Sequence, residues 1–144
     1  MLVLKNKMVM LEIPAEAAYI DVVRYTLYGI AANIGFSYEA IEDMKVAVSE
    51  AVNNAVLHAY PGNDAQKVDV RFEPFAEGMK ITVKDYGASF DAGAATSHAQ
   101  PVTESDIQQV VEGGLGIYLM QALMDEVQVI SEEGTEVILT KFLK

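Results

Sequence analysis

Residues 48–60 read VSEAVNNAVLHAY and form the second half of a predicted helix that runs from an N-cap at Ser37 to about Ala59. Apolar residues recur along this helix at spacings of three and four, the pattern of one buried face. Other apolar residues lie off that stripe, so the helix is apolar nearly all round from Met44 onward. A helix of this kind is buried on most of its sides.

A single polar ridge interrupts this apolar helix. Glu50, Asn54 and His58 follow one another at intervals of four residues and therefore share one side of it. A buried carboxylate or amide is costly unless it finds hydrogen-bond partners, which a bound ligand would supply. Carboxylate and amide oxygens also suit magnesium. The alternative is that the ridge faces solvent or forms hydrogen bonds within the protein.

The rest of the chain divides into strands and helices around this segment. Alternating apolar residues predict strands, and spacings of three and four predict helices. The predicted strands are residues 8–13, 67–72, 79–84, 127–131 and 136–142, and the predicted helices are residues 15–33, 37–59 and about 116–124. This order predicts an α+β fold, a two-layer α/β sandwich whose mixed, mostly antiparallel sheet carries helices on one face. The 144 residues fit one domain.

Two short motifs flank a long segment, residues 87–112, which has no sustained pattern and is rich in Ala, Gly, Ser and Thr. Connections of this length inside a domain are usually functional or disordered. Before the segment, Asp85-Tyr86-Gly87 ends a predicted strand. A carboxylate there can accept a hydrogen bond from an exocyclic amine such as that of adenine, and Gly87 lets the backbone approach a flat ligand. A plain turn is the alternative.

After the long segment, Gly113-Gly114-Leu115-Gly116 opens a predicted helix. Backbone amides at a helix N-terminus favour phosphate, and glycines let the phosphates come close. The alternative is a joint that only allows close packing. No lysine follows these glycines, so they do not form a Walker A loop, and their spacing differs from that of a Rossmann turn.

Composition limits the classes of function. The chain has no cysteine, which excludes disulfides, thiolate catalysis and zinc sites built on thiolates. The formal net charge is −11, with 10 basic against 21 acidic residues, which argues against direct binding of nucleic acid. No apolar run approaches the ~20 residues that span a bilayer, and Lys5 and Lys7 interrupt the apolar N-terminus. We therefore expect a cytoplasmic protein with no membrane association.

Taken in order, these motifs resemble those of the ATP-binding fold shared by gyrase, Hsp90, histidine kinases and MutL, the Bergerat fold. SEAVNNAVLHAY resembles its N box, DYGASFD its first glycine box, and EGGLGIYLM its second. Within this superfamily the chain resembles bacterial anti-sigma factor serine kinases of the sigma-B type. The shared features include SFD after the first box, the run GGLGIYLM followed by LMDEV, and the closing LTK. The resemblance covers essentially the whole chain.

The resemblance implies roles for individual residues. Glu50 matches the general base that activates a serine hydroxyl, and Asn54 matches a magnesium ligand that also contacts ATP. Asp85, with Gly87 beside it, matches the carboxylate that contacts the adenine amine. The lid over the nucleotide would be residues 87–112.

Three further glycines match the phosphate-binding end of that lid: Gly113, Gly114 and Gly116. Arg24 aligns with an arginine at the protein-partner surface of the family, although it could equally be an ordinary exposed arginine. Near the last hairpin, either Thr135 or Glu136 would take the place of an adenine-side threonine.

The function implied by the resemblance is that of an anti-sigma factor with serine kinase activity. Such a protein, implied to be a homodimer, binds a sigma-B-type sigma factor and phosphorylates its anti-anti-sigma antagonist on Ser or Thr with Mg-ATP. One alternative is a non-catalytic nucleotide-binding module that sequesters a sigma factor, although the presence of Glu50 argues against it. Another is the ATP-binding domain of a histidine kinase, which requires a phosphoacceptor histidine on a separate helical segment.

Overall fold

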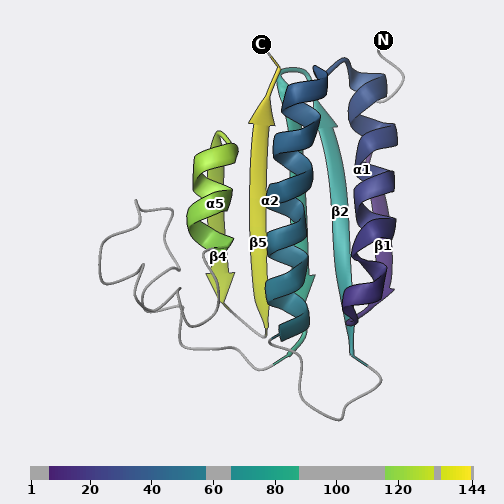
Figure 1. Cartoon of the computed structure of the whole chain (residues 1–144), viewed down its shortest axis with the longest axis vertical. Helices are drawn as coiled ribbons and strands as arrows, with labels where there is room; N and C mark the ends of the chain where they lie inside the picture. The colour runs from purple at the N-terminus through teal and green to yellow at the C-terminus, as the bar shows by residue number, and fades with distance from the viewer. Residues whose placement is uncertain (1–6, 58–65, 88–115, 132–133, 144) are drawn as a thin grey trace.

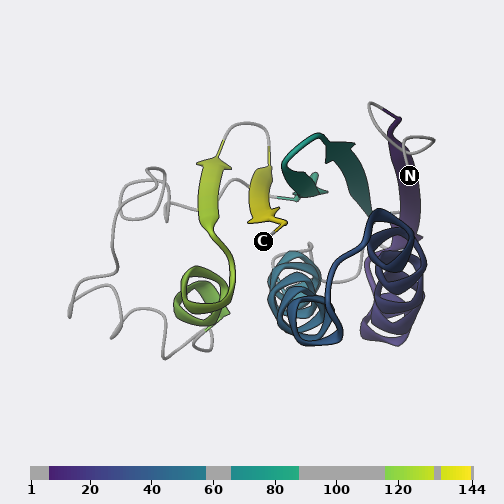
Figure 2. The same ribbon diagram turned by 90° about the horizontal axis from the view of Figure 1, so that it is seen from above.

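The computed structural model describes residues 7–57, 66–87, 116–131 and 134–143. They form two layers, a sheet and a row of helices on one of its faces (Figures 1 and 2). In chain order the elements are β1 (Val9–Pro14), the short 3-10 helix η2 (Ala17–Tyr19), α1 (Ile20–Ile34), α2 (Tyr38–Leu57), β2 (Lys67–Phe75), β3 (Gly78–Asp85), α5 (Gly116–Leu123), β4 (Glu126–Ser131) and β5 (Thr135–Phe142). The predicted order of elements and the α+β class are confirmed.

The sheet has the strand order β1-β2-β3-β5-β4, and every neighbouring pair among these described strands is antiparallel. Alternate residues of each strand face the helices and form the core. On the three central strands these include Phe72, Ile81 and Leu139, none of which is exposed at all. Burial of each such side chain stabilises the fold by about 1.5–3 kcal/mol.

Helix α2 lies in the middle of the helical layer, between α5 and α1 (Figure 2). It packs against both of these helices and against the sheet, which confirms the prediction that it is buried on most sides. Its N-terminus is capped as expected, because Ser37 Oγ accepts the Ala40 N–H at 3.1 Å.

Two boundaries differ from the sequence prediction by three residues or more. The first helix was expected from Ala15, but α1 begins at Ile20, after η2. The Ala15 N–H instead donates to Gln66 O at 3.1 Å, which continues the pairing beside β2 and delays the helix. Strand β2 continues past Phe72 and includes Pro74. Pro74 lies beyond the last residue of β2 that pairs with β1, on an edge-like stretch where proline is tolerated.

None of the helices in the described ranges is both long enough and apolar enough to cross a membrane.

Candidate active site

Three of the predicted site residues meet where α2 and α5 touch. Glu50 and Asn54 are half-buried on α2, and Gly116, the first residue of α5, is buried against them. A Cβ atom placed on Gly116 would lie 3.0 Å from Glu50 Oε1 and 3.2 Å from Asn54 Nδ2. Only glycine therefore allows the first turn of α5 to come this close without moving the two polar side chains. Glu50 and Asn54, the part of the ridge that the structure describes, face a neighbouring helix terminus, as a ligand site between the helices would require.

A second polar cluster lies where β3 ends and β5 begins. Asp85 pairs with Thr135 across these strands, and the two side chains are 4% and 6% exposed. They share the helix-facing side of the sheet with Val83 and Val137. Asp85 Oδ1 accepts the Gly87 N–H at 3.1 Å, so the Asp-Tyr-Gly motif closes into a turn that fixes the carboxylate.

Thr135, and not Glu136, turns to the helix-facing side of the sheet. Its Oγ1 is buried and has no hydrogen-bond partner among the described residues. Glu136 points to the opposite face of the sheet, where its Oε2 lies 3.0 Å from Arg71 Nη2. A buried hydroxyl without a partner is unfavourable, so the observation points to a group that is supplied by a ligand.

Gly134 brings the β4–β5 connection against this cluster. Its φ of 99° lies in the left-handed region that favours glycine. A Cβ atom at this position would collide with the carbonyl oxygen of Asp85 and would lie 3.1 Å from Tyr86 Cα. Glycine at position 134 therefore allows the turn after Asp85 and the start of β5 to lie close together.

The two clusters lie at the same end of the molecule. In Figure 1 the C-terminal end of α2, the beginning of α5, the end of β3 and the beginning of β5 are all at the lower end. Three other predictions concern residues outside the described ranges: the lid segment, of which residues 88–112 are not described, and Gly113 and Gly114.

Arg24 connects α1 to α2 instead of lying free on the surface. Its Nε donates to Ser49 Oγ at 2.8 Å, and its Nη1 lies 2.6 Å from Asp21 Oδ1. Ser49 Oγ in turn donates to Lys45 O at 2.7 Å. Arg24 thus binds α2 at the residue before Glu50, while 42% of its side chain remains exposed.

Two polar contacts of the described residues could not be found from the sequence. One is the hydrogen bond between Arg24 and Ser49, which are 25 residues apart along the chain. The other is on the open face of the sheet, where Tyr86 Oη donates to Asp69 Oδ2 at 2.6 Å. This hydrogen bond, with burial and the negative charge of Asp69, raises the pKa of Tyr86 to about 12. Asp85, the last residue of β3, and Tyr86, which follows it, therefore point to opposite faces of the sheet.

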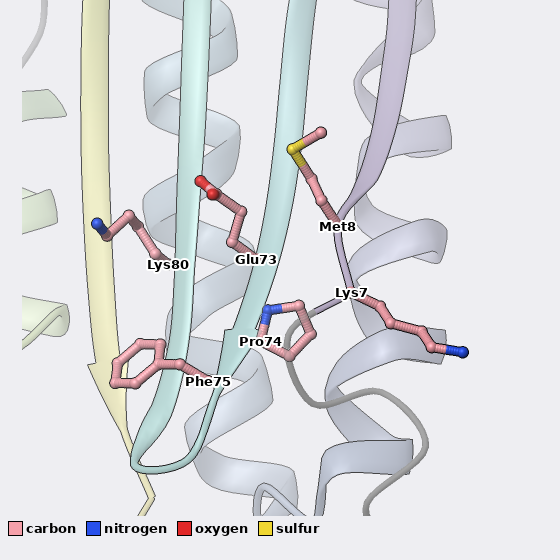
Figure 3. Close-up of a pocket in the computed structure, with 6 residues that line it drawn as sticks. All are labelled: Lys7, Met8, Glu73, Pro74, Phe75 and Lys80. Atoms are coloured by element: carbon pink, nitrogen blue, oxygen red, sulfur yellow. The ribbon is translucent and has the colours of Figure 1, made fainter.

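A hollow on the open face of the sheet lies away from this end. It has a volume of about 360 Å³ and is lined by Lys7, Met8, Glu73, Pro74, Phe75 and Lys80 (Figure 3). Phe75 pairs with Gly78 at one end of the β2–β3 hairpin, whereas Asp85 pairs with Val68 at the other. None of the predicted site residues lines this hollow.

The residues at the site end suit a nucleotide in three respects. Asp85 and the unpaired Thr135 hydroxyl offer an acceptor and a donor side by side, as an adenine edge requires. Glu50 Oε1 and Asn54 Nδ2 place a carboxylate and a polar amide beside the N-terminus of α5. Gly116 leaves that N-terminus free of side-chain bulk, so backbone amides can approach an anion.

Comparison with known proteins identifies the class. The family described as histidine kinase-like ATPase domain matches residues 13–141. A solved structure of the RsbU and RsbW domains of a Mycobacterium tuberculosis protein has a TM-score of 0.66 at 22% identity; the match covers 94% of this chain and 32% of that one. The histidine kinase domain of a blue-light-activated kinase from Erythrobacter litoralis has a TM-score of 0.55 at 19% identity, over 90% of this chain and 61% of that one. At these identities the likeness concerns the fold, which is that of an ATP-binding domain.

Relatives of higher identity narrow the class to one family. The serine-protein kinase RsbW of Bacillus velezensis is 47% identical over 134 residues, which are 92% of this chain and 84% of the relative. The Bacillus subtilis protein of the same name is 43% identical over the same shares. The Staphylococcus epidermidis protein is 43% identical over 93% of this chain and 86% of its own. The chain belongs to the serine-protein kinase RsbW family, and it is an ATP-binding protein kinase.

Proposed function

We propose that this kinase is an anti-sigma factor that transfers the γ-phosphoryl group of ATP to a serine or threonine of an anti-anti-sigma protein. When it is not bound to that anti-anti-sigma protein, the kinase binds a sigma-B-type sigma factor and holds it inactive. The observation that carries this proposal is the contact of Gly116 with Glu50 and Asn54, because it joins a phosphate-binding helix terminus to a base and a polar amide. The relatives' name, serine-protein kinase RsbW, supports the reaction.

Glu50 acts in this proposal as the general base. Its carboxylate accepts the proton of the attacking hydroxyl, whose oxygen then bonds to the γ-phosphorus while the bond to the β,γ-bridging oxygen breaks and ADP leaves. Catalysis otherwise depends on the positioning and neutralisation of the phosphates. Asn54 would hold magnesium, which supplies positive charge to the phosphate oxygens when it is bound.

The adenine end is assigned to the strand cluster. Asp85 accepts a hydrogen bond from the adenine amine, and the Thr135 hydroxyl bonds to the ring beside it. Gly87 lets the ring lie close to the backbone. Gly113 and Gly114 extend the phosphate-binding end that begins at Gly116, and residues 87–112 form the lid of a single domain that spans residues 1–144.

We assign the partner surface to Arg24 and the outer side of α1. Arg24 presents a partly exposed cation, and Tyr25 nearby is 78% exposed. The family resemblance further suggests a homodimer and a cytoplasmic location. Met8 and Met10, each 52% exposed on or beside β1, provide apolar surface for self-association. Sedimentation of the purified chain across a range of concentrations tests the dimer.

The decisive experiment follows phosphate transfer by intact mass after incubation of the kinase with Mg-ATP and the anti-anti-sigma protein from the same operon. Wild type is expected to add one phosphate to a serine or threonine. Glu50→Ala should bind ATP as wild type does but transfer phosphate at least about 10²-fold more slowly. Glu42→Ala, on the same helix and paired with Lys45, is the matched control and should retain transfer.

The outcomes separate the proposal from its alternative. Transfer at the wild-type rate by Glu50→Ala would remove that residue from the role of base. ATP binding without transfer to any anti-anti-sigma protein, in a wild type that still inhibits a sigma factor, would favour a module that only sequesters the sigma factor.

A further inference from the structure

Hydrogen bonds join β5 to Leu123, the last residue of α5, and to Asp125, two residues further along the chain. Lys141 Nζ donates to the carbonyl oxygen of Leu123, the last residue of α5, at 2.7 Å. The Asp125 N–H donates to Thr140 O at 2.9 Å, and Asp125 Oδ2 accepts the Phe142 N–H at 2.7 Å. Only the first of these bonds reaches the helix itself, and only the first is made by a cationic side chain.

Lys141 lies between the two helices that form the candidate active site. It is on the helix-facing side of β5, with Val137 and Leu139, and its side chain is 17% exposed. Its Nζ is 4.0 Å from Asp43 Oδ2 on α2. A cation at the C-terminal end of a helix is favoured by the helix dipole, and here the same cation also attracts a carboxylate of α2.

The opposite end of α5 is the end that touches Glu50 and Asn54. Gly116 and Leu123 are the two ends of an eight-residue helix, which is about 12 Å long. Lys141 is six residues along β5 from Thr135, a distance of about 20 Å along a strand. Lys141 is therefore too far from the Asp85–Thr135 cluster to touch an adenine bound there. Any effect of Lys141 on a nucleotide must pass through the helices that it contacts, α5 by a hydrogen bond of 2.7 Å and α2 by the longer contact with Asp43.

We propose that Lys141 is a positioning residue that sets how far α5 extends along α2, and thereby where the Gly116 end presents its amides to phosphate. The apolar contacts of the buried Met120 and Met124 hold α5 to the core but are non-directional. The hydrogen bond to Leu123 O is directional, so it fixes the helix along its axis. This inference rests on the proposed function, because it takes the Gly116 end as the phosphate contact.

The test compares a ligand that reaches both ends of the site with one that reaches only the strand cluster. ATP and adenosine are titrated against full-length wild type and Lys141→Met. The Kd for ATP should rise about tenfold, because a bond from a charged donor is lost. The Kd for adenosine should stay within about twofold, because Asp85 and Thr135 are untouched. A loss that came only from weakened folding would affect both ligands alike.

Two variants complete the test. Lys141→Arg should restore most of the ATP affinity, because the side chain lines a pocket of about 220 Å³ that leaves room for a guanidinium group. Lys45→Met removes a lysine of α2 whose cation pairs with Glu42, and it should leave both affinities unchanged. Lys141→Gln, which keeps a polar group in the half-buried position, replaces Lys141→Met if that variant does not fold.

Each result has one meaning. Unchanged ATP affinity in the Lys141 variants, or parallel losses for ATP and adenosine, would overturn the positioning role while leaving the proposed kinase intact. A wild type that binds adenosine and ATP equally well, with no phosphate contribution, would overturn the assignment of the Gly116 end and with it the proposed function.

Discussion

The two ends of this sheet use polar groups in opposite ways. At the end where β2 turns into β3, polar atoms bond to one another: the Leu143 N–H donates to Glu77 O at 2.7 Å, and Lys141 and Asp125 fasten α5 to β5. At the other end, two side-chain oxygens, Asp69 Oδ1 and Thr135 Oγ1, are buried with no hydrogen bond among the described residues.

The difference separates a structural end from a binding end. Unpaired buried polar atoms lower stability, so a protein keeps them where a ligand or partner completes their bonds. Gly116 agrees with this difference, because a side chain there would press on the side chains of Glu50 and Asn54. Substitutions at the binding end should change function more than stability. Substitutions at the structural end should do the reverse, except at Lys141, whose bond to Leu123 O positions α5 for phosphate.

Among the variants that compare the two ends, the largest effect is expected for Gly116→Ala. The added methyl would press on Glu50 Oε1 and Asn54 Nδ2, 3.0 and 3.2 Å from its position, and would displace both side chains. Phosphate transfer should fall by about ten- to a hundredfold, as misplacement of catalytic groups usually costs. The free energy of unfolding should change by less than about 1 kcal/mol, because flexible side chains can move aside.

Gly29→Ala is the control for that substitution. Gly29 is also helical, but no atom lies within 4 Å of its added Cβ. This variant should gain about 0.5–1 kcal/mol of stability and transfer phosphate normally. Equal activity of the two variants would mean that the close contact at Gly116 serves packing only.

Thr135→Val should change affinity and stability in opposite directions. Without nucleotide the variant should be more stable by about 1 kcal/mol, because a buried hydroxyl without a partner has been removed. Its Kd for ATP should rise about three- to tenfold, since one hydrogen bond to the ligand is lost. Thermal denaturation with and without ATP measures both. Thr140→Val, on the opposite face of β5, is the control. A loss of stability in Thr135→Val would show that the hydroxyl is bonded within the protein.

Ser37→Ala tests the structural end. Ser37 Oγ accepts the Ala40 N–H at 3.1 Å and caps α2 at the end away from Glu50. The substitution should lower the free energy of unfolding by about 1 kcal/mol, measured by urea denaturation, and leave the Kd for ATP unchanged. A rise in that Kd as large as the one in Thr135→Val would contradict the separation of the two ends.

The smallest effect concerns Tyr86 and the pH. Its pKa is raised from 10.0 to about 12, chiefly by the hydrogen bond to Asp69, so the protonated form is favoured by folding. The stabilisation is fully present below pH 10 and is lost as the pH rises through about 12. The stability difference between wild type and Tyr86→Phe should therefore shrink across this window in urea denaturation. A difference that stays constant to pH 12 would mean that the Asp69 bond contributes nothing.

Much of the fold could be predicted because periodicity reports burial directly. The apolar circumference of α2 indicated a helix enclosed by neighbours, and alternation located every strand that the structure describes. The contact of Gly116 with Glu50 and Asn54 brings together residues of two motifs that had been identified separately in the sequence. The catalytic and binding roles of these residues remain predictions until the variants are measured.

What the sequence could not supply is which distant groups meet. Residues 135–142 alternate apolar side chains in both phases, so only the pairing of Asp85 with Thr135 shows which residue faces the helices. The Arg24–Ser49 bond and the Lys141–Leu123 bond join elements whose relative positions depend on the packed sheet. Hydrophobic patterns carry no information about such pairs.

Two glycines, one at the structural end and one at the binding end, show how the two ends would compare in a library of variants. A side chain at Gly78 would collide with the carbonyl oxygen of Lys141, and one at Gly134 would collide with that of Asp85. Both positions should therefore be depleted of every other residue after selection for function, although only Gly134 lies beside the candidate active site. Selection for folding alone should give the same depletion at both, so tolerance of substitution would not reveal which glycine borders the nucleotide.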